Sequence, residues 1–235
     1  ASVPASVVLR KSGVFQTIDP PYLKAKNLKE FTLVLDLDET IVHLKLNPNN
    51  PNEGILKVRP YIIEFLEQVG KLYEIVIFTA ATQEYADTLL SEIEDSDKIY
   101  FDYRLYRQHT IIIDNEFVKD LRRIGRPLDK MIIVDNMPQN FRLQKENGIF
   151  IKPFWGDDNN DNALLELLDI LTKIAKEGGD VRKGLKKYRD EIVRKVAPVI
   201  LKNTSLKVDV HNPDIKIRIE VRPHETYVMN DVVYG

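Results

Sequence analysis

The chain of 235 residues contains no cysteine, which excludes a disulfide framework, a cysteine-ligated zinc site, an iron–sulfur cluster and a thiol nucleophile. It has only four histidines, and because they are scattered along the sequence a histidine-rich metal site is not expected. No apolar run approaches the roughly 20 residues that a membrane-spanning helix needs. With 43% apolar and 30% charged residues, the chain instead has the composition of a globular protein.

The sequence also lacks a large excess of charge of either sign. Its 34 basic and 36 acidic residues give a net charge of −2, so we expect no direct binding of nucleic acid through bulk charge. The first residues show no basic segment followed by an apolar core, which predicts no secretory signal and an intracellular location in the nucleus or the cytoplasm. Because the sequence does not begin with methionine, an anchor that preceded it would not be visible.

The hydrophobic pattern divides the chain into three parts. Residues 1–30 read as an irregular leader with one edge strand at 6–10. Residues 31–179 alternate short apolar strands with amphipathic helices, which predicts an α/β fold: a three-layer, Rossmann-like, mainly parallel sheet with helices on both faces. Two glycines end this pattern, and residues 180–235 follow as an extension with a basic helix and a β-hairpin.

The individual elements are expected from periodicity and from turn residues. Strands are predicted at 31–36, 73–78, 101–107, 109–113, 131–135 and 148–151, and helices at 60–70, 83–93, 162–175 and 180–201. A hairpin flap is predicted at 41–58 with a loose tip at 47–54, and the extension adds strands at 206–210, 215–221 and 225–233.

Polar residues follow three of the buried strands at the point where each strand ends. The first strand gives Asp36-Leu-Asp38, the second gives Thr79, and the third gives Asp135-Asn136. Because the carboxyl ends of parallel strands line one crevice, we expect these side chains to meet there. Two neighbouring carboxylates repel each other and lose hydration when buried, so an apolar strand has no packing reason to end in this way.

A hard cation such as Mg²⁺ would resolve that repulsion, since it takes oxygen ligands and keeps several waters. Asp36 could then attack phosphorus as a nucleophile. Asp38 could protonate the leaving oxygen and later take a proton from the attacking water. The hydroxyl of Thr79 is available for a phosphoryl oxygen, whose charge needs fixed donors or cations.

Six segments carry a resemblance to a known family: Val34-Leu-Asp-Leu-Asp-Glu-Thr40, Lys57-Val-Arg-Pro60, Val76-Ile-Phe-Thr-Ala80, Tyr106-Arg-Gln-His109, Val118-Lys-Asp-Leu121 and Ile133-Val-Asp-Asn136. The first is similar to the first motif of the haloacid dehalogenase superfamily of aspartyl-phosphate enzymes. Together, in this order and over about 60% of the chain, they resemble the small C-terminal-domain phosphatases and the Dullard-like, NLI-interacting-factor-like phosphatases.

The resemblance implies a role for each matching residue. Asp36 would be the phosphorylated nucleophile and Asp38 the general acid and base. Mg²⁺ would bind the Asp36 carboxylate, the backbone carbonyl of Asp38 and the side chain of Asn136. The remaining assignments are phosphoryl binding by Thr79, Lys119 and Thr40, support of the turn by Thr40, and orientation of Lys119 or a metal-bound water by Asp135. Lys119 is singled out by the resemblance alone.

The spacing leaves no room for a large cap domain between the first motif and Lys119, since a flap, one helix and a small sheet use up the residues. An open crevice suits a phosphorylated side chain of a protein, and the resemblance extends this to a peptide like the C-terminal domain of RNA polymerase II. A phosphoprotein- or protein-binding module on the same fold, a phosphoacceptor switch and a small-molecule phosphatase remain alternatives. The chain has the full set of site residues that the resemblance implies, which argues against a binding module: Asp36, Asp38, Thr79, Lys119 and Asn136. The second acid, Asp38, argues against a phosphoacceptor switch.

The predicted helix in residues 181–195 has seven basic and two acidic residues. Such a run is usually a solvated helix face. It could instead dock an acidic partner or an anionic membrane surface. No segment of residues 180–235 takes part in the resemblance, so the sequence leaves the role of this extension open.

Overall fold

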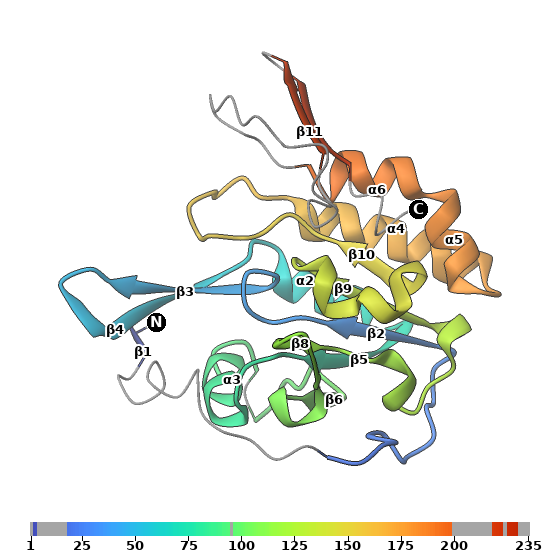
Figure 1. Ribbon diagram of the computed structural model, residues 1–235, viewed down its shortest axis with the longest axis horizontal. Helices are drawn as coiled ribbons and strands as arrows, with labels where there is room; N and C mark the ends of the chain where they lie inside the picture. The colour runs from blue at the N-terminus through green and yellow to red at the C-terminus, as the bar shows by residue number, and fades with distance from the viewer. Residues whose placement is uncertain (1, 4–17, 95, 199–217, 223–224, 230–235) are drawn as a thin grey trace.

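Short runs of branched and aromatic residues build a five-stranded parallel sheet at the centre of the fold (Figure 1). The structure is a computed structural model that describes residues 2–3, 18–94, 96–198, 218–222 and 225–229. The strands lie in the order β10, β9, β2, β5, β6. Their bounds are β2 Phe31–Leu35, β5 Tyr73–Phe78, β6 Tyr103–Leu105, β9 Met131–Asp135 and β10 Gly148–Phe150. The predicted α/β class with a parallel sheet is confirmed.

The two faces of the sheet are covered by different kinds of helix. Leu33 and Leu35 of β2 pack into one hydrophobic cluster, whereas Val34 between them packs into another. The first cluster is completed by α2 Ile62–Val69, α3 Gln83–Leu90 and α4 Ala163–Glu177. The second is completed by Leu23 and by residues of two 3₁₀ segments, η3 Leu121–Arg123 and η5 Pro138–Asn147. The three predicted layers are present, but the third is made of 3₁₀ turns and loops.

Only small insertions interrupt the central fold. A flap of two antiparallel strands, β3 Val42–Asn47 and β4 Asn50–Val58, follows β2, and β1 Ser2–Val3 pairs with β4. The flap turns between Asn47 and Asn50, so the loose tip predicted for residues 47–54 is wrong. After β6 come the 3₁₀ turn η2 Arg107–His109 and a hairpin of β7 Ile111–Ile113 and β8 Glu116–Val118. The 3₁₀ segment η4 Leu128–Lys130 precedes β9.

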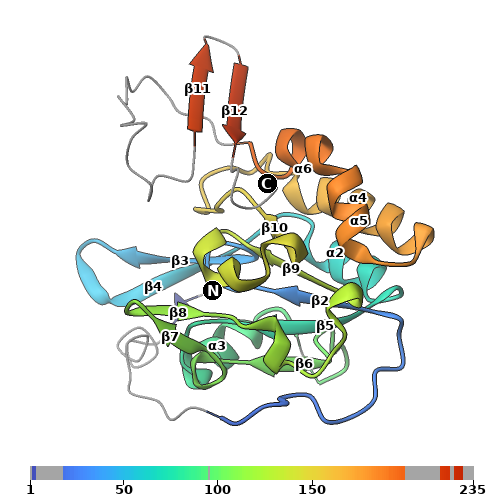
Figure 2. The same ribbon diagram turned by 45° about the vertical axis from the view of Figure 1, so that its right-hand side comes forward.

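The basic segment forms two helices and not the single helix predicted for residues 180–201. Asp180 accepts a hydrogen bond from the backbone N–H of Arg182 and begins α5 Val181–Lys187, and α6 Arg189–Lys195 follows after a break at Tyr188. Further on, β11 Arg218–Arg222 pairs with β12 Glu225–Met229 as an antiparallel hairpin (Figure 2). The strands predicted at 6–10 and 206–210 lie outside the described residues. Among the helices that are described, none is long and apolar enough to cross a membrane.

The break between α5 and α6 lets both helices direct apolar side chains into the core. Val181, Leu185, Ile192 and Val196 are buried in the same cluster as α4. On the outer side, basic residues pair with acids: Arg182 with Asp180, Lys187 with Glu177, and Lys195 with Glu166 and Glu191. Docking of an acidic partner or a membrane at this segment, like the division of the chain at residue 179, stays a prediction.

Truncating Ile192 tests whether α6 is part of this core. Because Ile192 is fully buried, we expect Ile192→Ala to lower the free energy of unfolding by about 3 kcal/mol, a typical cost for such a truncation. Unfolding in urea, followed by circular dichroism and fluorescence, should remain a single transition. Lys186→Ala, at an exposed position of α5, is the control and should change stability by less than about 0.5 kcal/mol. A separate early transition in Ile192→Ala, with the main one unchanged, would contradict this prediction.

Candidate active site

A buried lysine joins the ends of two neighbouring strands. Asp36 follows β2 directly and Asp135 ends β9, and these strands pair in parallel. The Nζ atom of Lys119 donates to Oδ1 of Asp36 and to Oδ2 of Asp135, at 2.6 Å in each case. Lys119 and Asp135 are inaccessible to solvent, and Asp36 is 6% exposed. The predicted meeting of strand ends therefore produces a buried carboxylate–ammonium–carboxylate triad.

The first turn of η5 holds this triad in place. The Asp135 carboxylate accepts hydrogen bonds from the backbone N–H of Met137 at 2.8 Å and from Nδ2 of Asn140 at 3.1 Å. The carbonyl of Asn140 in turn accepts the backbone N–H of Lys119 at 2.6 Å. Asn140 thus fixes both partners of the ion pair, a role that the sequence did not suggest.

The electrostatics of the triad follow from its burial. Burial alone would lower the pKa of Lys119, but the charges of Asp135 and Asp36 outweigh it and raise that pKa, so the side chain is an ammonium. Burial and the adjacent charge of Asp36 raise the pKa of Asp135 to about 6, against the opposing effect of Lys119. One ammonium therefore serves two carboxylates, and the triad leaves an excess of negative charge when both are ionised.

The turn after β2 places Thr40 under the carboxylate of Asp36. The Thr40 hydroxyl donates to Oδ2 of Asp36 at 3.0 Å, and Oδ1 of Asn136 lies 3.5 Å from the same hydroxyl. Glu39 has a φ of 58°, in the left-handed region, which marks a tight turn at this point. Because Thr40 is fully buried, we propose that it supports the turn, as the resemblance implied, and does not reach a phosphate.

Arg59 fastens this turn to the rest of the fold. Its Nη1 donates to the carbonyl of Thr40 at 2.9 Å and its Nη2 to the carbonyl of Lys152 at 3.0 Å. Its Nε and Nη2 also bond the carboxylate of Asp161 at 3.0 and 2.9 Å. Arg59 and Asp161 are both almost fully buried. Lys57-Val-Arg-Pro60 belonged to the family resemblance, but nothing in the sequence identified the partners of its arginine.

Asp38 and Thr79 lie at the ends of the neighbouring strands β2 and β5. Asp38 is partly exposed, and its Oδ1 accepts a hydrogen bond of 2.6 Å from the hydroxyl of Tyr85 on α3. The Thr79 hydroxyl accepts the backbone N–H of Ala81 at 3.0 Å, which leaves its own proton for another acceptor. The hydrogen bonds and ion pairs described above connect Asp36, Thr40, Lys119, Asp135 and Asn136, and they do not include Thr79.

His109, the last residue of the Tyr106-Arg-Gln-His109 segment, has a structural position. Its Nδ1 accepts the backbone N–H of Tyr106 at 2.9 Å, and its ring packs edge-on against Tyr22 at 4.9 Å between centroids. Burial lowers its pKa, so the ring is held neutral. These contacts fit a structural role for His109 and not that of a catalytic base.

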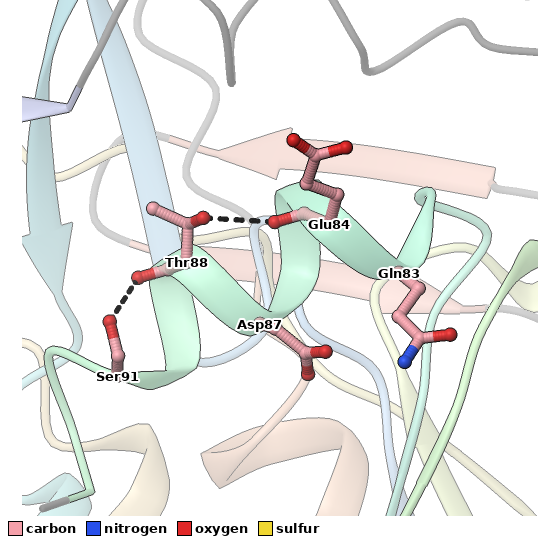
Figure 3. Close-up of a pocket in the computed structure, with 5 residues that line it drawn as sticks. All are labelled: Gln83, Glu84, Asp87, Thr88 and Ser91. Atoms are coloured by element: carbon pink, nitrogen blue, oxygen red, sulfur yellow. Dashed lines mark hydrogen bonds between the residues drawn. The ribbon is translucent and has the colours of Figure 1, made fainter.

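A surface hollow on α3 is separate from these residues. It is lined by four residues of α3 and by the residue that follows the helix: Gln83, Glu84, Asp87, Thr88 and Ser91 (Figure 3). Within it, the Thr88 hydroxyl donates to the carbonyl of Glu84 and the Ser91 hydroxyl to that of Thr88. None of the predicted site residues lines this hollow.

The oxygen ligands expected for Mg²⁺ fit such an ion. Asp36 and Asn136 both direct an oxygen toward the Thr40 hydroxyl, so a carboxylate and an amide oxygen converge on one point at the ends of β2 and β9. These are hard ligands of the kind that Mg²⁺ prefers, and they oppose the excess negative charge of the site. Among the described residues, no three acidic, histidine or cysteine side chains gather as a metal cluster. A magnesium site here would therefore depend on one carboxylate, an amide, a backbone carbonyl and water.

Comparison with models of known protein families identifies the family of this chain. Residues 31–182, more than half of the sequence, match the model of the NLI interacting factor-like phosphatases. The chain belongs to this family. Residues 180–231 match the model of the THUMP domain, in the part of the chain for which the sequence offered no resemblance.

Curated relatives agree with the family assignment. The chain is 39% identical over 181 residues to "CTD small phosphatase-like protein 3" of Caenorhabditis elegans, which covers 71% of this chain and 62% of that protein. It is 37% identical over 192 residues to "CTD small phosphatase-like protein 2" of Dictyostelium discoideum, covering 74% and 33%. The chain thus spans between one third and two thirds of the length of these two relatives.

A solved structure has the same fold. The structure of Fcp1, described as an essential RNA polymerase II CTD phosphatase, matches with a TM-score of 0.58 and 17% sequence identity, and the match covers 77% of each chain. At this identity the likeness concerns the fold alone. It is consistent with the parallel sheet and the covering layers described above.

Removing the charge of Asp161 tests the attachment of the Thr40 turn. Asp161→Asn leaves the Arg59 guanidinium buried without a charged partner, so we expect a loss of about 3 kcal/mol in the free energy of unfolding at pH 7. Arg59 keeps the pKa of Asp161 below its usual value despite burial. This contribution is present above the unfolded-state pKa of about 3.9 and disappears as the pH falls through the folded-state value.

The stabilities of the wild type and of Asp161→Asn, measured by urea unfolding, should therefore begin to converge as the pH falls below about 4 and should meet only below the lower folded-state pKa of Asp161. Asp157→Asn is the matched control, because Asp157 pairs with Lys45 at the exposed surface, and its effect should stay below about 1 kcal/mol. A loss in Asp161→Asn that is the same at pH 7 and pH 3 would contradict the assigned ion pair.

Proposed function

We propose that the chain is a Mg²⁺-dependent phosphatase that hydrolyses phosphoserine or phosphothreonine in proteins through an aspartyl-phosphate on Asp36. The observation that carries the proposal is the Lys119 ammonium held between Asp36 and Asp135, with the Asp38 carboxylate two residues from the nucleophile. The family assignment and the names of the relatives support it.

In the first step, a carboxylate oxygen of Asp36 attacks phosphorus, and the bond from phosphorus to the serine or threonine oxygen breaks. Asp38 gives its proton to the departing oxygen, so that the product leaves as an alcohol. In the second step, Asp38 takes a proton from water as the water oxygen attacks phosphorus. The acyl-phosphate bond breaks, which releases inorganic phosphate and restores the Asp36 carboxylate.

The surrounding side chains hold the phosphoryl group and the nucleophile. The Thr79 hydroxyl and the Lys119 ammonium donate to phosphoryl oxygens, Thr40 and Asp135 keep Asp36 and Lys119 in position, and the Asp36 carboxylate, the Asp38 carbonyl and the Asn136 side chain would bind Mg²⁺. When bound, Mg²⁺ supplies positive charge that offsets the negative charge of phosphate and carboxylates. Fixed charges of this kind provide most of the catalysis in phosphoryl transfer.

A protein side chain is the proposed substrate because the insertions around the site are small. The flap β3–β4 follows the first motif, and only α3, β6, η2 and the β7–β8 hairpin lie between Thr79 and Lys119. No cap domain is available in these described segments to enclose a small metabolite. Phosphopeptides that carry the repeat sequence of the C-terminal domain of RNA polymerase II are the first substrates to test, since the relatives are named CTD small phosphatase-like proteins. Comparable turnover of sugar phosphates and phosphopeptides would contradict this choice of substrate.

Replacement of the nucleophile and removal of the metal test the mechanism. We expect Asp36→Asn to lower phosphopeptide turnover by about a thousandfold or more, because an amide oxygen is a poor nucleophile. Chelation of Mg²⁺ should abolish wild-type turnover, and added Mg²⁺ should restore it. Phosphate release is the measurement, and Asp169→Asn, at an exposed ion pair on α4, should retain full activity. Turnover that persists in Asp36→Asn, or in the wild type after chelation of Mg²⁺, would rule out the proposed mechanism.

The acid role of Asp38 predicts a dependence on the leaving group. Asp38→Asn should lower turnover of a phosphopeptide by about a hundredfold or more, because a serine oxygen needs a proton to depart. With p-nitrophenyl phosphate, whose leaving group is a stable anion, formation of the aspartyl-phosphate should slow by about tenfold or less. Single-turnover kinetics on both substrates measure this step, and equal losses on the two would exclude Asp38 as the general acid.

A further inference from the structure

Tyr85 on α3 makes a direct contact with the proposed acid and base. Its ring is fully buried, and its hydroxyl donates a hydrogen bond of 2.6 Å to Oδ1 of Asp38. We propose that Tyr85 is a positioning residue that holds the Asp38 carboxylate in the orientation needed for proton transfer to the leaving group. This inference rests on the proposed function and names a residue that the motifs did not include.

Core packing alone does not explain why Tyr85 carries a hydroxyl group. The ring lies in the same hydrophobic cluster as Tyr73 and Phe65, where a phenylalanine would pack as well. A hydroxyl buried in such a cluster costs free energy unless it is hydrogen-bonded. The hydroxyl of Tyr85 meets this requirement at Asp38, which is partly exposed and lies two residues from the nucleophile.

The contact orients the Asp38 carboxylate through one of its oxygens. Oδ1 accepts the Tyr85 hydrogen bond, so the carboxylate is oriented through a single, defined oxygen. A short bond from a fixed donor restricts the rotation of an aspartate side chain, which otherwise has several rotamers.

The position of Tyr85 is itself well determined by the fold. Helix α3 buries Ala86, Leu89 and Leu90 beside Tyr85, while its opposite face carries the polar residues of Figure 3. The helix begins at Gln83, four residues after Thr79. The segment that follows β5 therefore supplies both the Thr79 hydroxyl and the residue that orients the carboxylate at the end of β2.

Tyr85→Phe removes the hydroxyl and keeps the ring, so the variant is expected to fold. We expect single-turnover formation of the aspartyl-phosphate from a phosphopeptide to slow by about tenfold, the effect of one hydrogen bond to a charged group. With p-nitrophenyl phosphate the same step should slow by less than about twofold, since that leaving group needs little proton donation. In an Asp38→Asn background, Tyr85→Phe should cause no further loss on either substrate.

Tyr73→Phe is the matched control. Tyr73 is fully buried in the same cluster, and its hydroxyl donates to the carbonyl of Leu171 at 2.8 Å, away from the site. Both variants should lower the melting temperature, but only Tyr85→Phe should change the ratio of the rates on the two substrates. A ratio in Tyr85→Phe equal to that of the wild type, or a change of the same size in Tyr73→Phe, would overturn the inference.

These outcomes separate the inference from the function on which it rests. If the wild-type chain hydrolyses both substrates and Asp38→Asn shows the leaving-group dependence, an unaltered ratio in Tyr85→Phe rejects the role of Tyr85 alone. If the wild-type chain hydrolyses neither substrate with Mg²⁺ present, the proposed function fails, and the role of Tyr85 fails with it.

Discussion

The burial of one ammonium between two carboxylates is the constraint on which the site depends. Charges taken out of water cost several kcal/mol each unless their partners are close and well oriented. Lys119 can lie in the interior only because Asp36 and Asp135 both reach its Nζ atom at 2.6 Å. Strands β2 and β9 must therefore be neighbours, and the chain between β8 and η3 must return to their carboxyl ends.

The site separates groups that are fixed from groups that are accessible. The Lys119 triad and the Thr40 hydroxyl are buried, and each has hydrogen-bond partners within the protein. Asp38 and Asn136, at the end of the same two strands, are partly exposed to solvent. The buried groups thus fix the positions of the carboxylate and hydroxyl oxygens, while the partly exposed groups leave one side of the site open to a ligand. Electrostatic catalysis requires this arrangement.

The sequence predicted those parts of the fold and of the site that depend on the local pattern of apolar and polar residues. The strands that end in Asp36, Thr79 and Asp135 are nearly continuous apolar runs, and their parallel arrangement brings two of these ends together as expected. The partners of Arg59 and Tyr85 could not be predicted, because each contact joins residues distant in sequence through side-chain geometry. Asn140 bonds Asp135 only five residues away, but its role also depends on the approach of the distant Lys119, which the local pattern does not show. The break at Tyr188 was missed for a related reason, since it depends on where Ile192 meets the core of α4. The 3₁₀ layer was missed because its irregular turns have no helical periodicity.

The boundary between the two matched families does not coincide with a boundary in packing. The matches overlap at residues 180–182, yet α5 and α6 bury Val181 and Ile192 in the cluster that covers the central sheet. At the end of α6, the carbonyl of Val196 accepts the N–H of Lys152, and the carbonyl of Lys152 accepts the guanidinium of Arg59. Arg59 also bonds the carbonyl of Thr40, in the turn that follows Asp36. Contiguity of this kind does not by itself establish coupling between sites. It does mean that the first helices of the THUMP-matched region pack into the same hydrophobic cluster that covers the central sheet, so this core is not confined to the residues that match the phosphatase family.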